Sequence, residues 1–148
     1  MDQRFTYRAA NETVLPQMVE LLQHAGLPVA DIENPSIKFL AAYSPTGEII
    51  GCIGLEQYGK NGLLRSLAVQ NGYRNKNIGS ALVNELIGLG RVQQISKLHL
   101  LTTTAEIFFQ RRGFKATNRS SAPGSIKQTA EFSGICPASA IYMVYGLT

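Results

Sequence analysis

A short polar loop joins an apolar strand to an amphipathic helix near the middle of this chain. The strand is expected at residues 63–69 and the helix at residues 78–89. The first N–H groups of a helix have no partner within the helix, and the helix dipole adds partial positive charge there. Arg74 and Lys76 add full charges, and the small pair Gly79–Ser80 lets a ligand approach the backbone. This segment therefore predicts a phosphate or pyrophosphate site.

The same segment also fits an ordinary strand–turn–helix connection with a solvated basic turn. It lacks the spacing of a Walker A loop and the glycine pattern of a dinucleotide fingerprint.

A second block follows, in which residues 97–102 predict a buried strand. Thr103 and Glu106 form a capping-box pair, which predicts a helix from about Thr104 that Gly113 ends.

Length and composition limit the classes of protein to which this chain can belong. A chain of 148 residues suits one domain, taken as residues 1–148, with one sizeable core. No stretch is apolar for the length of a membrane span, and the N-terminus lacks the apolar region of a signal peptide, so we expect a cytoplasmic protein. Neither the two cysteines nor the two histidines have metal-site spacing. The net charge of +4 suits a small polyanion better than nucleic acid.

The periodicity predicts a mixed α/β sheet with helices on both faces. Strands are expected at residues 5–8, 37–43, 49–57, 63–69, 97–102, 114–118 and 140–145, and helices at 11–25, 78–89, from about 104, and at 123–131.

The two blocks, in this order, resemble the GNAT N-acetyltransferases. Residues 74–79 follow their Arg/Gln-x-x-Gly-x-Gly/Ala pattern, with Asn77 in place of the first glycine. Asparagine tolerates a left-handed backbone better than most residues, so the departure is mild. Residues 105–114 follow the pattern A-x-x-F-Y-x-x-x-G-F. The resemblance implies a single-domain α/β protein with the GNAT acyl-CoA N-acyltransferase fold.

That resemblance implies acetyl-CoA as the acetyl donor, with no metal. A backbone N–H at the end of the central strand, assigned to Val69, would polarise the thioester carbonyl. The residues expected to bind acetyl-CoA are Leu67, Ala68, Val69, Arg74, Asn75, Lys76, Asn77, Ile78, Gly79, Ser80, Thr104, Phe108 and Arg111.

The tyrosine that usually protonates the leaving thiolate in this superfamily is replaced by Phe109. A phenyl ring cannot donate a proton, so the thiolate leaves unaided, through water, or with help from Thr103, Tyr142 or Tyr145. Glu56 is the candidate general base for the amine, and a solvated strand-end glutamate is the equal alternative.

Arg65 lies in the middle of the central strand, where an unpaired charge is costly. It could pair with Glu56 across the hairpin, or bind a substrate carboxylate, and we favour the second. Lys127 would add a second cation, and Thr102 and Thr103 would offer hydroxyls to the acceptor.

Three fragments, residues 63–69, 100–114 and 126–140, narrow the resemblance to the arsenic-resistance N-acetyltransferase family. The first two are also similar to the acetyltransferase domain of N-acetylglutamate synthase. The implied acceptor is a small acidic amino acid that resembles glutamate, or an organoarsenical or phosphinic analogue. A non-catalytic acyl-CoA-binding regulatory module is the alternative. We expect a small-molecule amine as partner, neither nucleic acid nor membrane, and leave a homodimer open.

Overall fold

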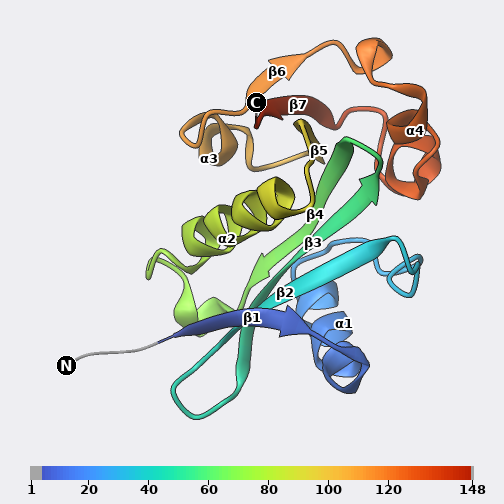
Figure 1. The fold of residues 1–148 in the computed structure, drawn as a ribbon. Helices are drawn as coiled ribbons and strands as arrows, with labels where there is room; N and C mark the ends of the chain where they lie inside the picture. Colours follow the sequence, from blue (N-terminus) through green and yellow to red (C-terminus); the bar gives the residue numbers. More distant parts are fainter. Residues whose placement is uncertain (1–4, 148) are drawn as a thin grey trace.

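Seven strands form one sheet in the computed structural model, which describes residues 5–147 (Figure 1). The strands are β1 (Thr6–Ala10), β2 (Ile37–Tyr43), β3 (Ile49–Tyr58), β4 (Asn61–Val69), β5 (Lys97–Thr102), β6 (Lys115–Thr117) and β7 (Ile141–Gly146). Their order across the sheet is β1-β2-β3-β4-β5-β7-β6. β4 and β5 run parallel, and the other neighbouring pairs run antiparallel.

Helices cover both faces of this sheet, as the sequence predicts. Their bounds are α1 (Leu15–His24), α2 (Ile78–Val92), α3 (Glu106–Gln110) and α4 (Gly124–Lys127), with a π-helical turn at Glu131–Ile135 and 3-10 turns at Glu12–Val14, Asn71–Tyr73 and Arg119–Ser121. α2 and α3 pack on one face, and α1 and α4 lie on the other (Figure 1). Within residues 5–147, no helix has both the length and the apolar character that crossing a bilayer requires.

The strand β3 shows how the two cores are separated. Ile53 and Leu55 are fully buried against α2, whereas Cys52 is buried against α1. Alternate side chains of a strand point to opposite faces, so a strand covered on both faces must be apolar on both. This explains why residues 49–57 form a nearly continuous apolar run.

The strands β4 and β5 pair only at one end. Their register covers Asn61, Gly62 and Leu63 of β4, and beyond Leu63 the two strands separate. β5 continues with β7 as its partner, while β4 continues with β3. The separation opens a space at the centre of the sheet, between the carboxyl ends of two parallel strands.

A buried histidine joins three strands at the closed end of this opening. His99 Nδ1 accepts from the Tyr142 hydroxyl at 2.6 Å, and its Nε2 donates to Asn61 Oδ1 at 2.8 Å. Burial, together with the charge of Lys97, lowers the pKa of His99 to about 4, so the ring is neutral at pH 7. His99 therefore has a structural role.

A β-bulge interrupts β4 where the strands have separated. Arg65 pairs with Gly54 and Ala68 pairs with Cys52, so two residues of β4, Ser66 and Leu67, lie opposite one residue of β3. Ser66 adopts φ 60°, a left-handed conformation that is typical of some bulges. Both bulge residues, Ser66 and Leu67, border the opening.

Most of the predicted elements are confirmed to within a few residues, and two local predictions are wrong. The Thr103–Glu106 capping box does not form; instead the Thr102 hydroxyl oxygen accepts from the Ala105 N–H at 3.0 Å, and α3 begins at Glu106. The helix expected over 123–131 ends at Lys127, because a π-helical turn replaces its second half. The N-terminal segment 1–4, used in the signal-peptide prediction, lies outside the described residues.

Candidate active site

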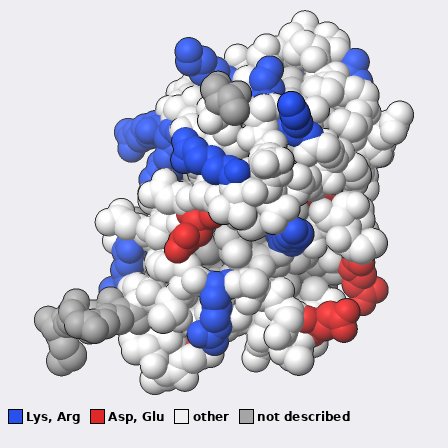
Figure 2. Space-filling model, viewed as in Figure 1, with Lys and Arg blue, Asp and Glu red and all other residues white. Residues whose placement is uncertain are grey.

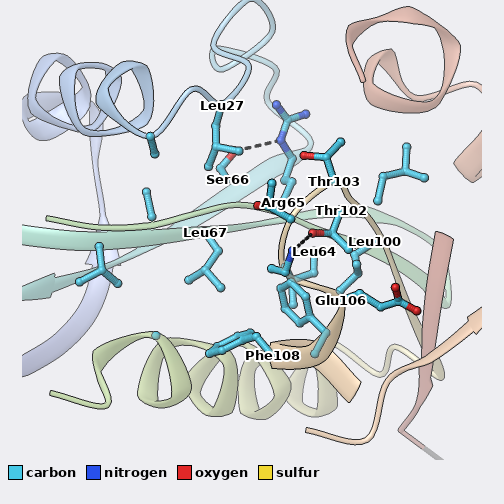
Figure 3. Close-up of a pocket in the computed structure, with 18 of the residues that line it drawn as sticks. Leu27, Leu64, Arg65, Ser66, Leu67, Leu100, Thr102, Thr103, Glu106 and Phe108 are labelled. Carbon is cyan, nitrogen blue, oxygen red and sulfur yellow. Dashed lines mark hydrogen bonds between the residues drawn. The ribbon is translucent and has the colours of Figure 1, made fainter. Parts of the chain in front are cut away.

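A cleft of about 1100 Å³ occupies the opening between β4 and β5. Its walls come from the end of β4, the loop before α2, the first turn of α2, the β5–α3 connection, the segment after α1 and the π-helical turn. Figure 3 shows Leu27, Arg65, Thr103 and Phe108 around this space, contributed by four different parts of the chain. The end of the cleft at α2, where the sequence predicts a phosphate, is called the phosphate-binding end, and a second end lies at Arg65.

The phosphate-binding end is built from backbone. Asn75 and Asn77 adopt φ 67° and 61°, and these left-handed residues turn the chain into α2. The first α-helical hydrogen bond runs from the Ala81 N–H to the Asn77 carbonyl oxygen at 3.0 Å. The N–H groups of residues 78–80 precede it and are available to an anion. The expected left-handed Asn77 is confirmed.

Arg112 joins α3 to this end of the cleft. Its guanidinium carbon lies 3.7 Å from the centre of the Phe108 ring, and Nη1 donates to the Phe108 carbonyl oxygen at 2.7 Å. Nη2 donates to the Ser80 hydroxyl in the first turn of α2. The Arg112 Nε is buried without a hydrogen-bond partner, and burial followed by the charge of Arg111 lowers the pKa of Arg112. Arg112 thus holds a positive charge beside the available N–H groups.

The residues present fit the pyrophosphate and the attached chain of acetyl-CoA. A Cβ on Gly79 would lie 3.4 Å from Phe108 Cζ, so glycine at this position keeps the passage between α2 and α3 open. Leu67, Ala68 and Val69 line the same passage along the separated edge of β4. Backbone groups of this edge lie where they can bind an extended ligand, because β5 has moved away.

Three carboxylates surround one guanidinium at the other end. Arg65 Nη1 and Nη2 each lie 2.6 Å from an oxygen of Asp31, and Nη1 also donates to Glu56 at 2.9 Å. Glu131 Oε2 lies 3.5 Å from Arg65 Nε, which also donates to the Ser66 hydroxyl at 3.2 Å. Burial lowers the pKa of Arg65, but the hydrogen bonds and charges of the three acids outweigh it and raise that pKa overall.

Glu131 is the carboxylate of this cluster that lines the cleft. Burial raises its pKa to about 7, against the opposing effect of Arg65 and with further increases from Asp31 and Glu56. Cys136 lines the cleft close by, and burial followed by the charge of Glu131 raises the pKa of its thiol to about 11. The sequence did not predict Glu131 in the cleft, because the expected 123–131 helix gave no reason to place it beside β4.

Comparison with known proteins identifies the fold and the family. Residues 35–116, more than half of the chain, match the family described as "Acetyltransferase (GNAT) domain". The chain belongs to the GNAT family. It is 30% identical over 124 residues to an amino-acid acetyltransferase of Mannheimia succiniciproducens, with 78% of this chain and 28% of that protein covered. It is 34% identical over 96 residues to an uncharacterized N-acetyltransferase of Chlorobaculum tepidum, with 64% of this chain and 60% of that protein covered.

A solved structure of similar fold is N-acetylglutamate synthase from Neisseria gonorrhoeae, complexed with coenzyme A and N-acetyl-glutamate. The TM-score is 0.82 at 21% identity, covering all of this chain and 36% of that one. Of the two curated relatives described above, this GNAT chain spans 28% of the length of the first and 60% of the length of the second. The narrower resemblance to the arsenic-resistance family stays a prediction.

The structure brings most of the predicted acetyl-CoA residues of this GNAT chain together. Those that line the cleft are Leu67, Ala68, Val69, Arg74, Asn75, Asn77, Ile78, Gly79, Ser80, Thr104 and Phe108. Lys76 and Arg111 are exposed and do not belong to the lining. For Arg111 this corrects the expected placement: its neighbour Arg112 points into the cleft, because the turn after α3 carries it back over Phe108.

The expected base, Glu56, and one expected acceptor-binding residue, Lys127, do not line the cleft. Glu56 is fully buried behind Arg65, accepts from the Tyr58 hydroxyl at 2.5 Å and does not line the cleft, so direct contact with an amine is not available to it. Lys127 is exposed on α4, whose buried residue Ile126 faces the core instead. The exposed position of Lys127 corrects the expected placement, and the full burial of Glu56 corrects the alternative of a solvated strand-end glutamate.

Thr102 and Thr103 line the cleft as expected, and so does Arg65. The Arg65 side chain is paired with carboxylates of the protein, including Glu56, which was the alternative to binding a substrate carboxylate. Thr103 is also the one hydroxyl among the three leaving-group candidates that reaches the cleft lining. Tyr142 is held by His99, and Tyr145 stacks on Phe114.

Charge on the surface is spread out. Figure 2 shows Lys and Arg side chains scattered over the face seen in Figure 1, without a continuous basic stripe. Among residues 5–147, no group of three or more His, Cys, Asp or Glu side chains has the arrangement of a metal site. The cluster of Asp31, Glu56 and Glu131 surrounds the Arg65 guanidinium.

Proposed function

We propose that this chain transfers an acetyl group from acetyl-CoA directly to the amine of a small amino-acid-like acceptor. One observation carries the proposal. A single cleft joins a helix N-terminus suited to pyrophosphate with a buried acidic cluster suited to an amine, and the separated edge of β4 runs between them. Two substrates held at the two ends would meet beside the bulge in β4.

The chain's own residues would divide the work by position. Backbone N–H groups of residues 78–80, with Arg74 and Arg112, would hold the pyrophosphate. The edge of β4 around Val69 would orient the pantetheine chain and donate a backbone hydrogen bond to the thioester carbonyl. Acetyl-CoA, when bound, supplies the activated acetyl group. Positioning both partners in one cleft is worth roughly 7–11 kcal/mol of the barrier for well-oriented reactants.

The relatives support an amino acid as the acceptor. One is called an amino-acid acetyltransferase, and the synthase of similar fold is complexed with N-acetyl-glutamate. A glutamate-like acceptor, or its organoarsenical or phosphinic analogue, is the finer proposal. The carboxylate of such an acceptor would bind in the cleft away from Arg65, because Asp31, Glu56 and Glu131 already face the guanidinium.

A non-catalytic acyl-CoA-binding module is the second candidate. It is favoured by Phe109, which stands where other GNAT enzymes carry a tyrosine. Phe109 is buried among Phe108 and Phe114, and its ring offers no proton to a leaving thiolate.

Mass spectrometry of acetylated products would test the two candidates. The chain is incubated with acetyl-CoA and a panel of acidic, neutral and basic amino acids, together with phosphinic and arsonous analogues of glutamate. We expect at least one amino acid to be N-acetylated, with coenzyme A formed in equal amount. Arg74→Ala should weaken acetyl-CoA binding measured by calorimetry and lower the rate at limiting donor. Tight acetyl-CoA binding without acetylation of any amine would instead support the regulatory module.

A further inference from the structure

We infer that Glu131 is the residue that binds the acceptor's ammonium group and removes its proton. This inference rests on the proposed acetyl transfer and names the residue and the charge of the acceptor that the same cleft recognises. It comes from the different ways in which three carboxylates meet Arg65.

Two of the three carboxylates are committed to the protein. Asp31 uses both oxygens on the guanidinium, each at 2.6 Å. Glu56 uses one oxygen on Arg65 at 2.9 Å and the other on the Tyr58 hydroxyl at 2.5 Å. Neither Asp31 nor Glu56 lines the cleft. Both are therefore occupied in holding Arg65 in place.

Glu131 differs from both. It makes the longest of the three ion pairs, at 3.5 Å, and it lines the cleft. Its exposed fraction is 4%, so a charge there is poorly solvated and gains from a cationic ligand. An ammonium group in the cleft would supply the compensating charge that one shared guanidinium does not.

Burial, together with the neighbouring carboxylates, favours proton uptake by Glu131 near neutral pH. Arg65 faces it from β4, Asp31 from the segment before β2, Glu56 from β3 and Cys136 from the end of the π-helical turn. Burial raises the pKa of Glu131 to about 7; Arg65 lowers it, whereas Asp31 and Glu56 raise it further. A base whose pKa lies near the working pH can both accept a proton and release it.

Glu131 also lies beside the expected site of transfer. Arg65 Nε contacts both Glu131 Oε2 and the Ser66 hydroxyl, and Ser66 is the first residue of the bulge. The carboxylate and the Ser66 hydroxyl thus meet at the same nitrogen, Arg65 Nε. An amine bound to Glu131 would share one cleft with the edge of β4 proposed to hold the thioester carbonyl, close to the start of the bulge.

The proton balance of this step is simple. Glu131 takes one proton from the ammonium, which leaves a neutral amine with a lone pair. That lone pair forms the bond to the acetyl carbon while the bond from this carbon to sulfur breaks. The second proton of the nitrogen goes to the leaving sulfur, giving the thiol of coenzyme A. Glu131 then releases its proton to water.

The cluster also restricts what the acceptor can be. With three carboxylates on one guanidinium, this end of the cleft carries excess negative charge at neutral pH. It should admit primary ammonium groups and reject the N,N,N-trimethylated analogue, which has the same charge but no proton to give. An acceptor's carboxylate should bind elsewhere in the cleft.

The pH dependence of kcat/KM in Glu131→Gln would test the inference. Wild type should show a limb that rises with a midpoint near pH 7, and Glu131→Gln should lose that limb and fall by roughly 10²–10⁴ in kcat/KM. Acetyl-CoA affinity should stay within about twofold, which shows that the variant is folded. Glu131→Asp keeps the charge and should regain part of the rate. The exposed Glu33→Gln is the matched control and should behave as wild type.

Two outcomes separate this inference from the proposed function. If wild type acetylates an amine and Glu131→Gln does so equally well with the same limb, the inference is overturned while the function stands. Difference infrared spectroscopy gives an arm that needs no turnover. A protonated carboxyl band that disappears near pH 7 should be present in wild type and missing from Glu131→Gln. Its absence from wild type overturns the inference whatever the activity.

Discussion

The two ends of the cleft are built in different ways. The phosphate-binding end uses the backbone N–H groups of residues 78–80, and its geometry follows from the turn before α2 and the start of that helix. The acceptor end uses side chains from Asp31, Glu56, Arg65 and Glu131, which meet only when four separate segments have packed. One end is local and partly exposed, whereas the other is assembled over long distances and buried.

This difference has energetic consequences. Charges near the surface interact weakly and are screened by salt, so a single residue at the phosphate end should change binding modestly. The buried cluster holds three carboxylates and a single cation, and removing that cation leaves all three without compensation. Removing Arg65 from this cluster should therefore destabilise the fold, whereas substitutions at the phosphate-binding end should lower affinity only.

Arg65→Met should have the largest effect. It leaves three buried carboxylates without their cation, which should lower the free energy of unfolding by about 3–5 kcal/mol in urea denaturation at pH 7. Lys127→Met removes an exposed cation and should change stability by less than about 0.5 kcal/mol. Equal stability of the two variants would show that the acceptor end is no more interdependent than the surface.

Arg74→Ala should have a smaller effect, and on a different property. Losing a charge-assisted contact with the pyrophosphate should weaken acetyl-CoA binding by about 1–3 kcal/mol, with unfolding little changed. Lys76→Ala is the comparison, because Lys76 is exposed and does not line the cleft. Calorimetry should show the weaker effect for Lys76→Ala, and the reverse order would place the pyrophosphate on the other side of the loop.

Arg112→Leu should have the smallest effect. It removes the contacts with Phe108 and Ser80 that join the two walls of the phosphate end, and should weaken acetyl-CoA binding by about 1 kcal/mol. Arg111→Leu removes the same charge from an exposed position and should leave the affinity unchanged. If both variants lose affinity equally, the effect is one of general charge and not of the cleft.

The two ends of the cleft also differ in how well the sequence predicted them. The loop of residues 74–80 was predictable because helix starts and left-handed residues have local signatures. Asp31 and Glu131 were not, because nothing local marks a carboxylate that will meet an arginine 34 or more positions away. The capping-box prediction was wrong because a neighbouring residue took its place: the Thr102 hydroxyl oxygen accepts from the Ala105 N–H, and α3 begins at Glu106.

The bulge in β4 is not required by the pairing of the sheet, yet it lies beside the cleft. The pairs Gly54–Arg65 and Cys52–Ala68 lie on either side of it, and the strand carries one residue more than regular pairing needs. Without that residue the alternation of β4 would continue unbroken, with Arg65 and Ala68 on the faces they already occupy. The chain thus holds one amino acid in surplus to its sheet. Its removal would change the sheet little, but would remove the irregular stretch of strand that borders the cleft.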